Sequence, residues 1–342
     1  MKDFFKIPPV SPKRIFGLRE SSFANDLFIS AVSHFDFFNF LDRNPSDIEG
    51  ICNSLNIKKR PADVMLTLFK AYGFINEMDG VFYLSETSRQ FLTKKSSFDL
   101  SSYVISLKDR PICEAIKNVL ITGKPASWAV KKDGKEWSTA MEEEKFAESF
   151  TAAMNSRGAY LANGLLKALN LKSRKSLLDI GGASGIYSAL LLSKYPGLKA
   201  TVFEKPPVDK VATYSIKKLG LTGRMDVIAG DMFKDELPTG YDVHLISHVL
   251  HDWDINDVKV VIENSYRNLS HGGMIVIHDA HINRKKDGPL SVAEYSVLLM
   301  VLSEGKCYSV KEIEQILADT GFKKIRYMPT ILNRSIITGV KV

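Results

Sequence analysis

The stretch that decides the fold of this chain is Leu177-Leu178-Asp179-Ile180-Gly181-Gly182-Ala183-Ser184-Gly185. It predicts a buried strand over 176–180, a glycine turn, and a helix over 186–195. Glycine lets a backbone approach a ligand closely, and the N–H groups at a helix N-terminus carry positive partial charge. Ala183 and Ile186 stand where a dinucleotide fingerprint needs glycine, and no Gly-Lys-Ser/Thr of a P-loop follows. The turn therefore suits a small, zwitterionic or cationic nucleoside ligand better than a pyrophosphate.

Acidic residues follow the next predicted strands. Glu204 ends a strand over 200–203, about 20 residues after the glycine turn, where an α/β unit places a carboxylate to accept both ribose hydroxyls. A strand over 225–229 is followed by Asp231 and Met232, which suit an adenine amine and an adenine ring. A fourth strand, over 242–247, leads into the sequence His248-Val249-Leu250-His251-Asp252-Trp253-Asp254.

These motifs resemble those of S-adenosylmethionine-dependent methyltransferases. The order D-I-G-G-A-S-G, F-E-K-P, G-D-M-F and V-L-H-D-W is similar to that of the plant caffeate and bacterial antibiotic O-methyltransferase family, from about residue 15 to the C-terminus. The resemblance implies S-adenosyl-L-methionine as the cofactor. It also implies the residues that hold this cofactor: Asp179, Gly181, Gly182, Gly185, Glu204, Asp231, Met232 and Ser247.

The expected fold class is α/β. From residue 176 onward predicted strands and helices alternate, which indicates a mostly parallel sheet with helices on both faces. The later strands are expected over 274–278, 323–329 and 335–342, and Ser309 opens a helix that Gly321 closes. The resemblance implies a Rossmann-like methyltransferase sheet whose final hairpin carries an antiparallel strand.

The expected domain order has three parts. Residues 1–110 form a mostly helical, winged-helix-like dimerisation domain, 111–170 form connecting helices that roof the active site, and 171–342 bind the cofactor. A polar loop over 131–144 marks the rough boundary. A length of 342 residues suits about two domains.

The bulk composition describes an ordinary globular chain, with 45% hydrophobic and 25% charged residues. No apolar run approaches the ~18 residues of a membrane span. Three distant cysteines without a C-x-x-C motif favour a reducing cytoplasm. The net charge of +7 is dispersed in short runs, so neither a nucleic-acid nor a membrane partner is expected.

The N-terminal region has a helix, turn, helix and hairpin pattern. Pro61 opens a helix over 62–72, and Asp79-Gly80 is a hairpin turn. This pattern also occurs in DNA-binding winged helices, so a non-enzymatic regulator is one alternative. Lys70 is the helix's one basic residue, however, whereas a helix that reads DNA needs polar and basic side chains. The resemblance implies a homodimer interface instead, and an ordinary core is the simpler interpretation of the same apolar residues.

The acceptor of the methyl group is expected to meet a helix over 142–169. The resemblance assigns Phe150, Met154 and Asn155 to its substrate-facing side. Arg157 either holds an acidic substrate or is an ordinary surface arginine. A second group of expected pocket walls, which could equally be core, comprises Trp253, Tyr295 and Leu299.

A phenol has a pKa near ~10, so at neutral pH it needs a base to become nucleophilic. A histidine, with a pKa near ~6.5, is suited to that role. The resemblance implies that His251 is this base and that Asp279 orients it. Asp254 is expected to cap a helix near 255. Cys307 occupies the position of the family's second orienting carboxylate, and Glu304 is a possible substitute.

Six of the seven histidines cluster between residues 244 and 281. A metal site formed by two histidines and a carboxylate is therefore an alternative, drawn from His248, His251, Asp252, His278, Asp279 and His281. The simpler interpretation is that His244 and His278 are buried strand residues and that no metal binds. The sequence thus predicts O-methylation of a hydroxylated aromatic or related small acid, with C- or S-methylation, with or without a metal, as the alternative.

Overall fold

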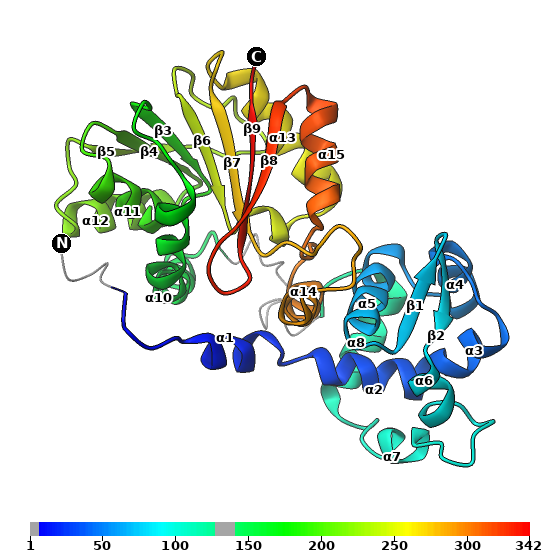
Figure 1. Ribbon diagram of the computed structural model, residues 1–342. Coiled ribbons are helices and arrows are strands. Elements are labelled where there is room, and N and C mark those ends of the chain that lie inside the picture. Colours follow the sequence, from blue (N-terminus) through cyan, green and yellow to red (C-terminus); the bar gives the residue numbers. More distant parts are fainter. Residues whose placement is uncertain (1–6, 127–140) are drawn as a thin grey trace. The chain divides into compact units, whose positions relative to one another are not determined.

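The computed structural model of the chain describes residues 7–126 and 141–342 (Figure 1). These residues form two compact units. The sheet unit comprises 7–11, 141–281 and 310–342, and the helical unit comprises 12–126 and 282–309. Both units are discontinuous in sequence, whereas the division expected from the sequence is into consecutive segments. Most of the polar loop expected over 131–144 lies outside the described residues.

The sheet unit is built on seven strands in the order β5-β4-β3-β6-β7-β9-β8. The strands are β3 (Ser176–Ile180), β4 (Lys199–Glu204), β5 (Met225–Ala229), β6 (Val243–Ser247), β7 (Met274–Asp279), β8 (Lys323–Pro329) and β9 (Ser335–Val340). The first five run parallel, and β9 lies antiparallel between β7 and β8. The expected antiparallel strand of the final hairpin is confirmed.

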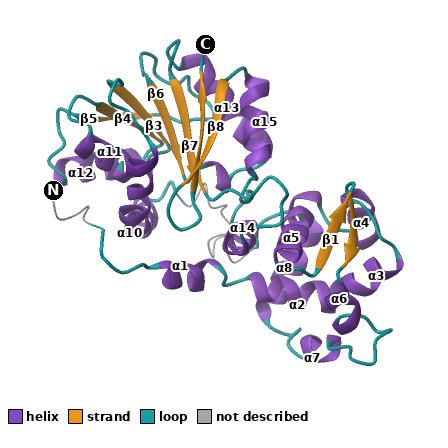
Figure 2. Cartoon of the chain, viewed as in Figure 1, coloured by secondary structure: helices purple, strands orange, loops and turns teal. Residues whose placement is uncertain are grey.

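Helices cover both faces of this sheet (Figure 2). One face carries α10 (Glu144–Ala168), α11 (Ile186–Lys194) and α12 (Val208–Lys218), and the other carries α13 (Ile255–Asn268) and α15 (Val310–Thr320). All five residues of β6 are buried, as a central parallel strand requires.

The helix α13 begins where its cap was expected. The Asp254 carboxylate accepts the backbone N–H of Asn256 at 2.7 Å and that of Asp257 at 3.1 Å. Such a side chain satisfies donors that the first turn of a helix leaves unpaired. Asp254 is therefore a capping residue.

The helical unit contains a two-stranded hairpin among helices. Its elements are α1 (Lys13–Glu20), α2 (Ala24–Phe35), α3 (Phe37–Arg43), α4 (Ile48–Leu55), α5 (Lys59–Ala71), β1 (Ile75–Met78), β2 (Val81–Leu84), α6 (Glu86–Phe91), α7 (Ser101–Ile105), α8 (Pro111–Thr122) and α14 (Leu290–Leu302). Asp79 and Gly80 both have positive φ, as a two-residue hairpin turn of the primed type requires. None of the described helices combines the length and apolar character needed to cross a membrane.

The helix that a DNA-binding interpretation would use is α5, and it is largely buried. It starts at Lys59, two residues before the expected first position at Pro61. Its buried residues include Val64, Met65 and Phe69, and it packs against α14 of the same unit. The helix therefore serves as core.

Polar contacts tie the segment 282–309 to α5. The Arg60 guanidinium donates to the carbonyl oxygens of Gly305 at 2.7 Å and Gly123 at 2.8 Å. The Asp63 carboxylate forms ion pairs with Lys286 at 2.9 Å and with Lys306. Burial opposes ionisation of Asp63, but the two lysine charges outweigh burial and lower its pKa from 3.8 to about 2. The ionised carboxylate is thus held by its partners.

We expect Asp63→Asn to lower the free energy of unfolding by about 2 kcal/mol at pH 7, because it removes the charge that pairs with two poorly exposed lysines. Since the folded pKa lies below the unfolded one, this contribution is complete above the unfolded pKa and fades as the pH falls toward 2. Urea unfolding at pH 7 and pH 3.5 measures it. The control is Glu49→Gln, which breaks an exposed pair with Lys59 and should change little. A deficit of the same size at both pH values would contradict this account.

Candidate active site

The carboxyl ends of the parallel strands gather polar side chains at one edge of the sheet. Asp179 lies near the end of β3, Glu204 ends β4, Ser247 ends β6 and Asp279 ends β7. These strands are neighbours in the sheet. Ligands of open α/β sheets bind outside this edge, so the edge is where a site is expected.

The glycine turn after β3 passes directly over Asp179. Gly181 and Gly185 have φ of 65° and 74°, in the left-handed region that favours glycine. A Cβ added at Gly182 would lie 2.5 Å from Cγ of Asp179. The turn therefore needs glycine both for its conformation and for its close approach to the carboxylate.

Two carboxylates beside this turn, that of buried Asp179 and that of half-buried Glu204, have no cationic partner among the residues that the structure describes. The Asp179 Oδ2 atom accepts the Ser188 hydroxyl at 2.5 Å, while its Oδ1 has no hydrogen-bond partner among the described residues. Glu204 accepts the backbone N–H groups of Ala183 and Lys205, both at 2.9 Å. Burial raises the pKa of Asp179 to about 6 and that of Glu204 to about 7. A ligand rich in donors or carrying positive charge would stabilise both carboxylates.

A cleft of two adjoining cavities runs along the turn. One, of about 120 Å³, is lined by Gly181, Glu204, Gly230, Asp231, Met232, Phe233 and Trp253 among others. The other, of about 140 Å³, shares Gly181, Glu204, Met232 and Trp253, and adds Phe150, Met154, Asn155, Arg157, Gly182, Ser247, His248 and Asp252. The structure thus brings most of the expected site residues to one cleft.

Trp253 was expected as a wall of the substrate pocket. Its ring packs edge-on against Phe233, with 4.5 Å between ring centroids. Both rings line the smaller cavity with Asp231 and Met232. Trp253 therefore lies at the end of the cleft expected to hold adenine. Phe233 was not singled out from the sequence, although it directly follows Met232.

Tyr295 and Leu299 lie in α14 of the helical unit, where both are buried. Cys307 is also buried in that unit, and its backbone N–H donates to the Ser296 hydroxyl at 3.0 Å. The expected roles of Tyr295 and Leu299 as pocket walls, and of Glu304 as a substitute carboxylate, remain predictions.

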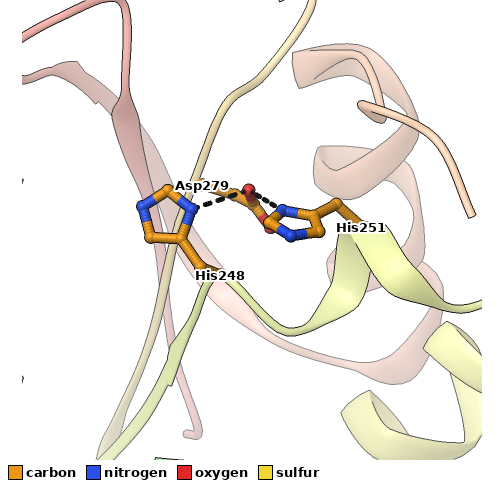
Figure 3. A group of neighbouring side chains, drawn as sticks. All are labelled: His248, His251 and Asp279. Atoms are coloured by element: carbon orange, nitrogen blue, oxygen red, sulfur yellow. Dashed lines mark hydrogen bonds and ion pairs between the residues drawn. The ribbon is translucent and has the colours of Figure 1, made fainter. Parts of the chain in front are cut away.

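His251 and Asp279 form a buried pair (Figure 3). His251 belongs to the short 3₁₀ helix η1 (Leu250–Asp252) that follows β6. Its Nδ1 lies 2.5 Å from Oδ1 of Asp279, which also accepts the N–H of Ala280 at 2.7 Å. When Nδ1 carries the proton shared with Asp279, Nε2 is the basic nitrogen. The expected pairing of His251 with Asp279 is present.

The electrostatics of this pair favour a basic imidazole. Burial disfavours the charged form of His251, but the negative charges of Asp279 and Asp252 outweigh it and raise its pKa above 6.5. Burial likewise disfavours ionised Asp279, but the charge of His251 outweighs it and lowers the carboxyl pKa. The Asp252 carboxylate lies 3.7 Å from Nε2 of His251. From the sequence, Asp252 was expected beside His251 only within the alternative metal set.

The other clustered histidines divide into two kinds. His244, His278 and His281 are buried, and each bonds a serine hydroxyl through Nδ1, at 2.8–3.0 Å. Burial lowers their pKa values to about 3, 3 and 4. His244 and His278 are thus buried strand residues, as the simpler interpretation held. His248 differs, because neither of its ring nitrogens has a hydrogen-bond partner among the described residues.

The fold and this edge define the class of protein. A seven-stranded sheet with a single reversed strand, combined with a glycine turn beside two uncompensated carboxylates, is the arrangement of an S-adenosylmethionine-dependent methyltransferase. The residues fit this cofactor. Asp179 has a buried oxygen without a hydrogen-bond partner among the described residues, and Glu204 suits the ribose hydroxyls. Gly182 has no room for a side chain beside the Asp179 carboxylate.

Comparison with known proteins identifies the family. A family model described as an O-methyltransferase domain matches residues 116–323, so the chain belongs to the O-methyltransferase family, whose enzymes use S-adenosylmethionine. A relative from Streptomyces sahachiroi, 3-hydroxy-5-methyl-1-naphthoate 3-O-methyltransferase, is 27% identical over 300 residues, covering 87% of this chain and 86% of the relative.

Solved structures agree. An O-methyltransferase family 2 protein from Planctomyces limnophilus, in complex with apigenin, is 27% identical with a TM-score of 0.88, covering 99% of this chain and 98% of that one. Human N-acetylserotonin methyltransferase, in complex with S-adenosylmethionine, has the same fold, with 20% identity, a TM-score of 0.60, and coverage of 98% and 99%. The chain is therefore an enzyme, and the alternatives of a regulator or of C- or S-methylation are not favoured.

We expect Gly182→Ala to weaken binding of S-adenosylhomocysteine at least about tenfold, because the new Cβ pushes against Asp179 beneath the turn. Isothermal titration calorimetry measures the affinity. Gly197→Ala is the control, since an added Cβ there meets nothing within 4 Å. Unchanged affinity in a folded Gly182→Ala protein would show that the turn tolerates a side chain.

Proposed function

We propose that this enzyme transfers the methyl group of S-adenosylmethionine to the hydroxyl oxygen of a hydroxylated aromatic or related small acid. The observation that carries the proposal is the buried pair of His251 and Asp279 at the carboxyl edge of the sheet. The names of the relatives support the acceptor class, since one methylates a hydroxynaphthoate and another was solved with the hydroxylated aromatic apigenin.

The chain must make the acceptor hydroxyl nucleophilic. Bound S-adenosylmethionine supplies an electrophilic methyl group, so alignment and deprotonation of the acceptor remain for the protein. Nε2 of His251 takes the hydroxyl proton, and Asp279 holds Nδ1–H so that the ring presents Nε2. The Asp279 charge also stabilises the imidazolium that results.

The cofactor residues take separate roles along the cleft. Glu204 accepts from the ribose hydroxyls, while Asp231 and Met232 meet the adenine. Gly181, Gly182 and Gly185 allow the close approach of the turn. Ser247, at the end of β6, lines the same cleft. Asp179, near the end of β3, supports the turn from beneath.

The acceptor lies against α10. Phe150 and Met154 supply apolar contact, Asn155 supplies an amide, and the Arg157 guanidinium pairs with a carboxylate of the bound ligands.

The enzyme acts as a cytoplasmic homodimer. Its three cysteines, Cys52, Cys113 and Cys307, are all buried, which suits a reducing compartment. Exposed apolar side chains gather around α7, where Phe98 is 67% and Tyr103 80% exposed. Such a surface suits burial against a second copy of the chain.

His251→Ala should lower kcat by about 10²- to 10⁴-fold, the usual contribution of a general base, while S-adenosylhomocysteine binding changes little. The assay follows S-adenosylhomocysteine release with a panel of phenols and hydroxylated aromatic acids, and mass spectrometry and NMR locate the methyl group. His271→Ala, in an exposed loop of the same unit, is the control. Turnover that survives in His251→Ala, or a methyl group on carbon or sulfur, would refute the proposed mechanism.

The pH dependence of kcat tests the role of Asp279. Activity should rise with pH through the pKa of His251, which the Asp279 charge raises. Asp279→Asn removes that charge, so the acidic limb of the pH–rate profile should move to lower pH while the plateau falls. An acidic limb that stays in place would show that Asp279 does not act on the base.

Replacing both Phe98 and Tyr103 with aspartate should convert the dimer to a monomer, because charge is costly in a buried apolar interface. Light scattering coupled to gel filtration measures the mass. Tyr214→Asp in the sheet unit, equally exposed at 67%, is the matched control. A dimer that persists in the double variant would place the interface elsewhere.

A further inference from the structure

Three side chains of the sheet unit bring their ligand atoms together: those of His248, His251 and Asp279 lie within 4.8 Å of one another (Figure 3). We propose that they form a binding site for a zinc-class divalent cation, and that the bound ion blocks methyl transfer. The inhibitory half rests on the proposed role of His251 as the base, whereas the binding half stands independently.

The donor set selects the kind of ion. Two imidazole nitrogens and one carboxylate oxygen suit Zn²⁺, Co²⁺ or Fe²⁺. Mg²⁺ and Ca²⁺ prefer oxygen ligands throughout. Three protein ligands also leave a coordination position for water, as in many zinc sites.

His248 has features that the sheet alone does not require. It has φ of 55°, in the left-handed region that residues other than glycine adopt uncommonly, although histidine is enriched there with asparagine and aspartate. Its ring is buried, and both ring nitrogens lack a hydrogen-bond partner among the described residues, whereas His244, His278 and His281 each bond a serine.

The distances are close to those that a metal needs. Zinc bonds of about 2.0–2.1 Å in tetrahedral geometry place ligand atoms about 3.3 Å apart. Nδ1 of His248 already lies 3.5 Å from Oδ1 of Asp279. Nδ1 of His251 lies 2.5 Å from the same oxygen, so an ion between them widens this distance and replaces the shared proton. The ion therefore removes the hydrogen bond that orients the proposed base.

An ion can reach this site from the cleft. His248 and Asp252 line the larger cavity, together with Ser247 and Val249. The ligands come from the end of β6, from η1 and from the end of β7, so neighbouring strands of the sheet hold them in place. Small rotations of the side chains are then sufficient for coordination.

The test titrates the full-length protein, in chelator-free buffer, with ZnCl₂ by calorimetry and with CoCl₂ by visible absorption. We expect one ion per chain, cobalt bands of a low-coordinate site, and loss of turnover over the same zinc range, reversed by a chelator. His248→Phe keeps an aromatic ring but removes both nitrogens. His248→Asn is the second variant, because asparagine tolerates a positive φ. His271→Ala is the matched control for an exposed histidine.

Zinc affinity at least about tenfold lower in both His248 variants, and unchanged in His271→Ala, would support the site. Equal affinity in the wild type and a folded His248 variant would overturn it, as would the absence of a 1:1 complex with either ion. Zinc that binds through His248 without inhibiting turnover would support the site and contradict the assignment of His251 as the base. These outcomes therefore distinguish a wrong assignment of His251 as the base from a wrong assignment of the metal site.

Discussion

The parallel register of β3, β4, β6 and β7 is the constraint on which the site depends. Parallel strands end on the same edge of a sheet, so the residues that end them become neighbours however far apart they lie in sequence. Asp179 and Asp279, one hundred positions apart, are brought to one edge in this way. Helix α11 joins β3 to β4 and helix α13 joins β6 to β7, and the turns that follow β3 and β6 form walls of the cleft. The cofactor turn and the proposed base thus have one structural origin.

Burial at this edge has opposite effects on its carboxyl groups. Within the described part of the chain no cation lies beside Asp179 or Glu204, so burial raises their pKa values to about 6 and 7. Asp279 is buried as well, but the imidazole of His251 lies against it and lowers its pKa. The first two carboxyl groups depend on a ligand to stabilise their charge, whereas the third is stabilised by the protein. This difference separates groups suited to bind a cationic cofactor from a group suited to orient a base.

Much of this arrangement could be predicted from the sequence, because central parallel strands are continuous apolar runs and their ends are marked by acidic residues. The bounds of β3, β5 and β8 agree with the expected ones. The location of α14 could not be predicted in this way. This helix is apolar on every side, with nine buried residues in thirteen, so no face indicates which unit it packs with. Nor does sequence spacing show that Asp252 lies beside His251 while Asp254 caps a helix.

The backbone at His248 shows why the remaining details depend on tertiary structure. Its N–H donates to the carbonyl of His278 at 2.9 Å, which extends the pairing of β6 with β7 by one residue. The chain then turns through a left-handed conformation into η1, and three residues later His251 faces Asp279. A left-handed residue other than glycine costs about 1–2 kcal/mol, which glycine would avoid. Since histidine rather than glycine occupies this turn, the need for a left-handed backbone does not by itself explain the imidazole side chain. The turn is explained by the direction in which His251 must point, and the proposed metal site gives the imidazole of His248 a role of its own.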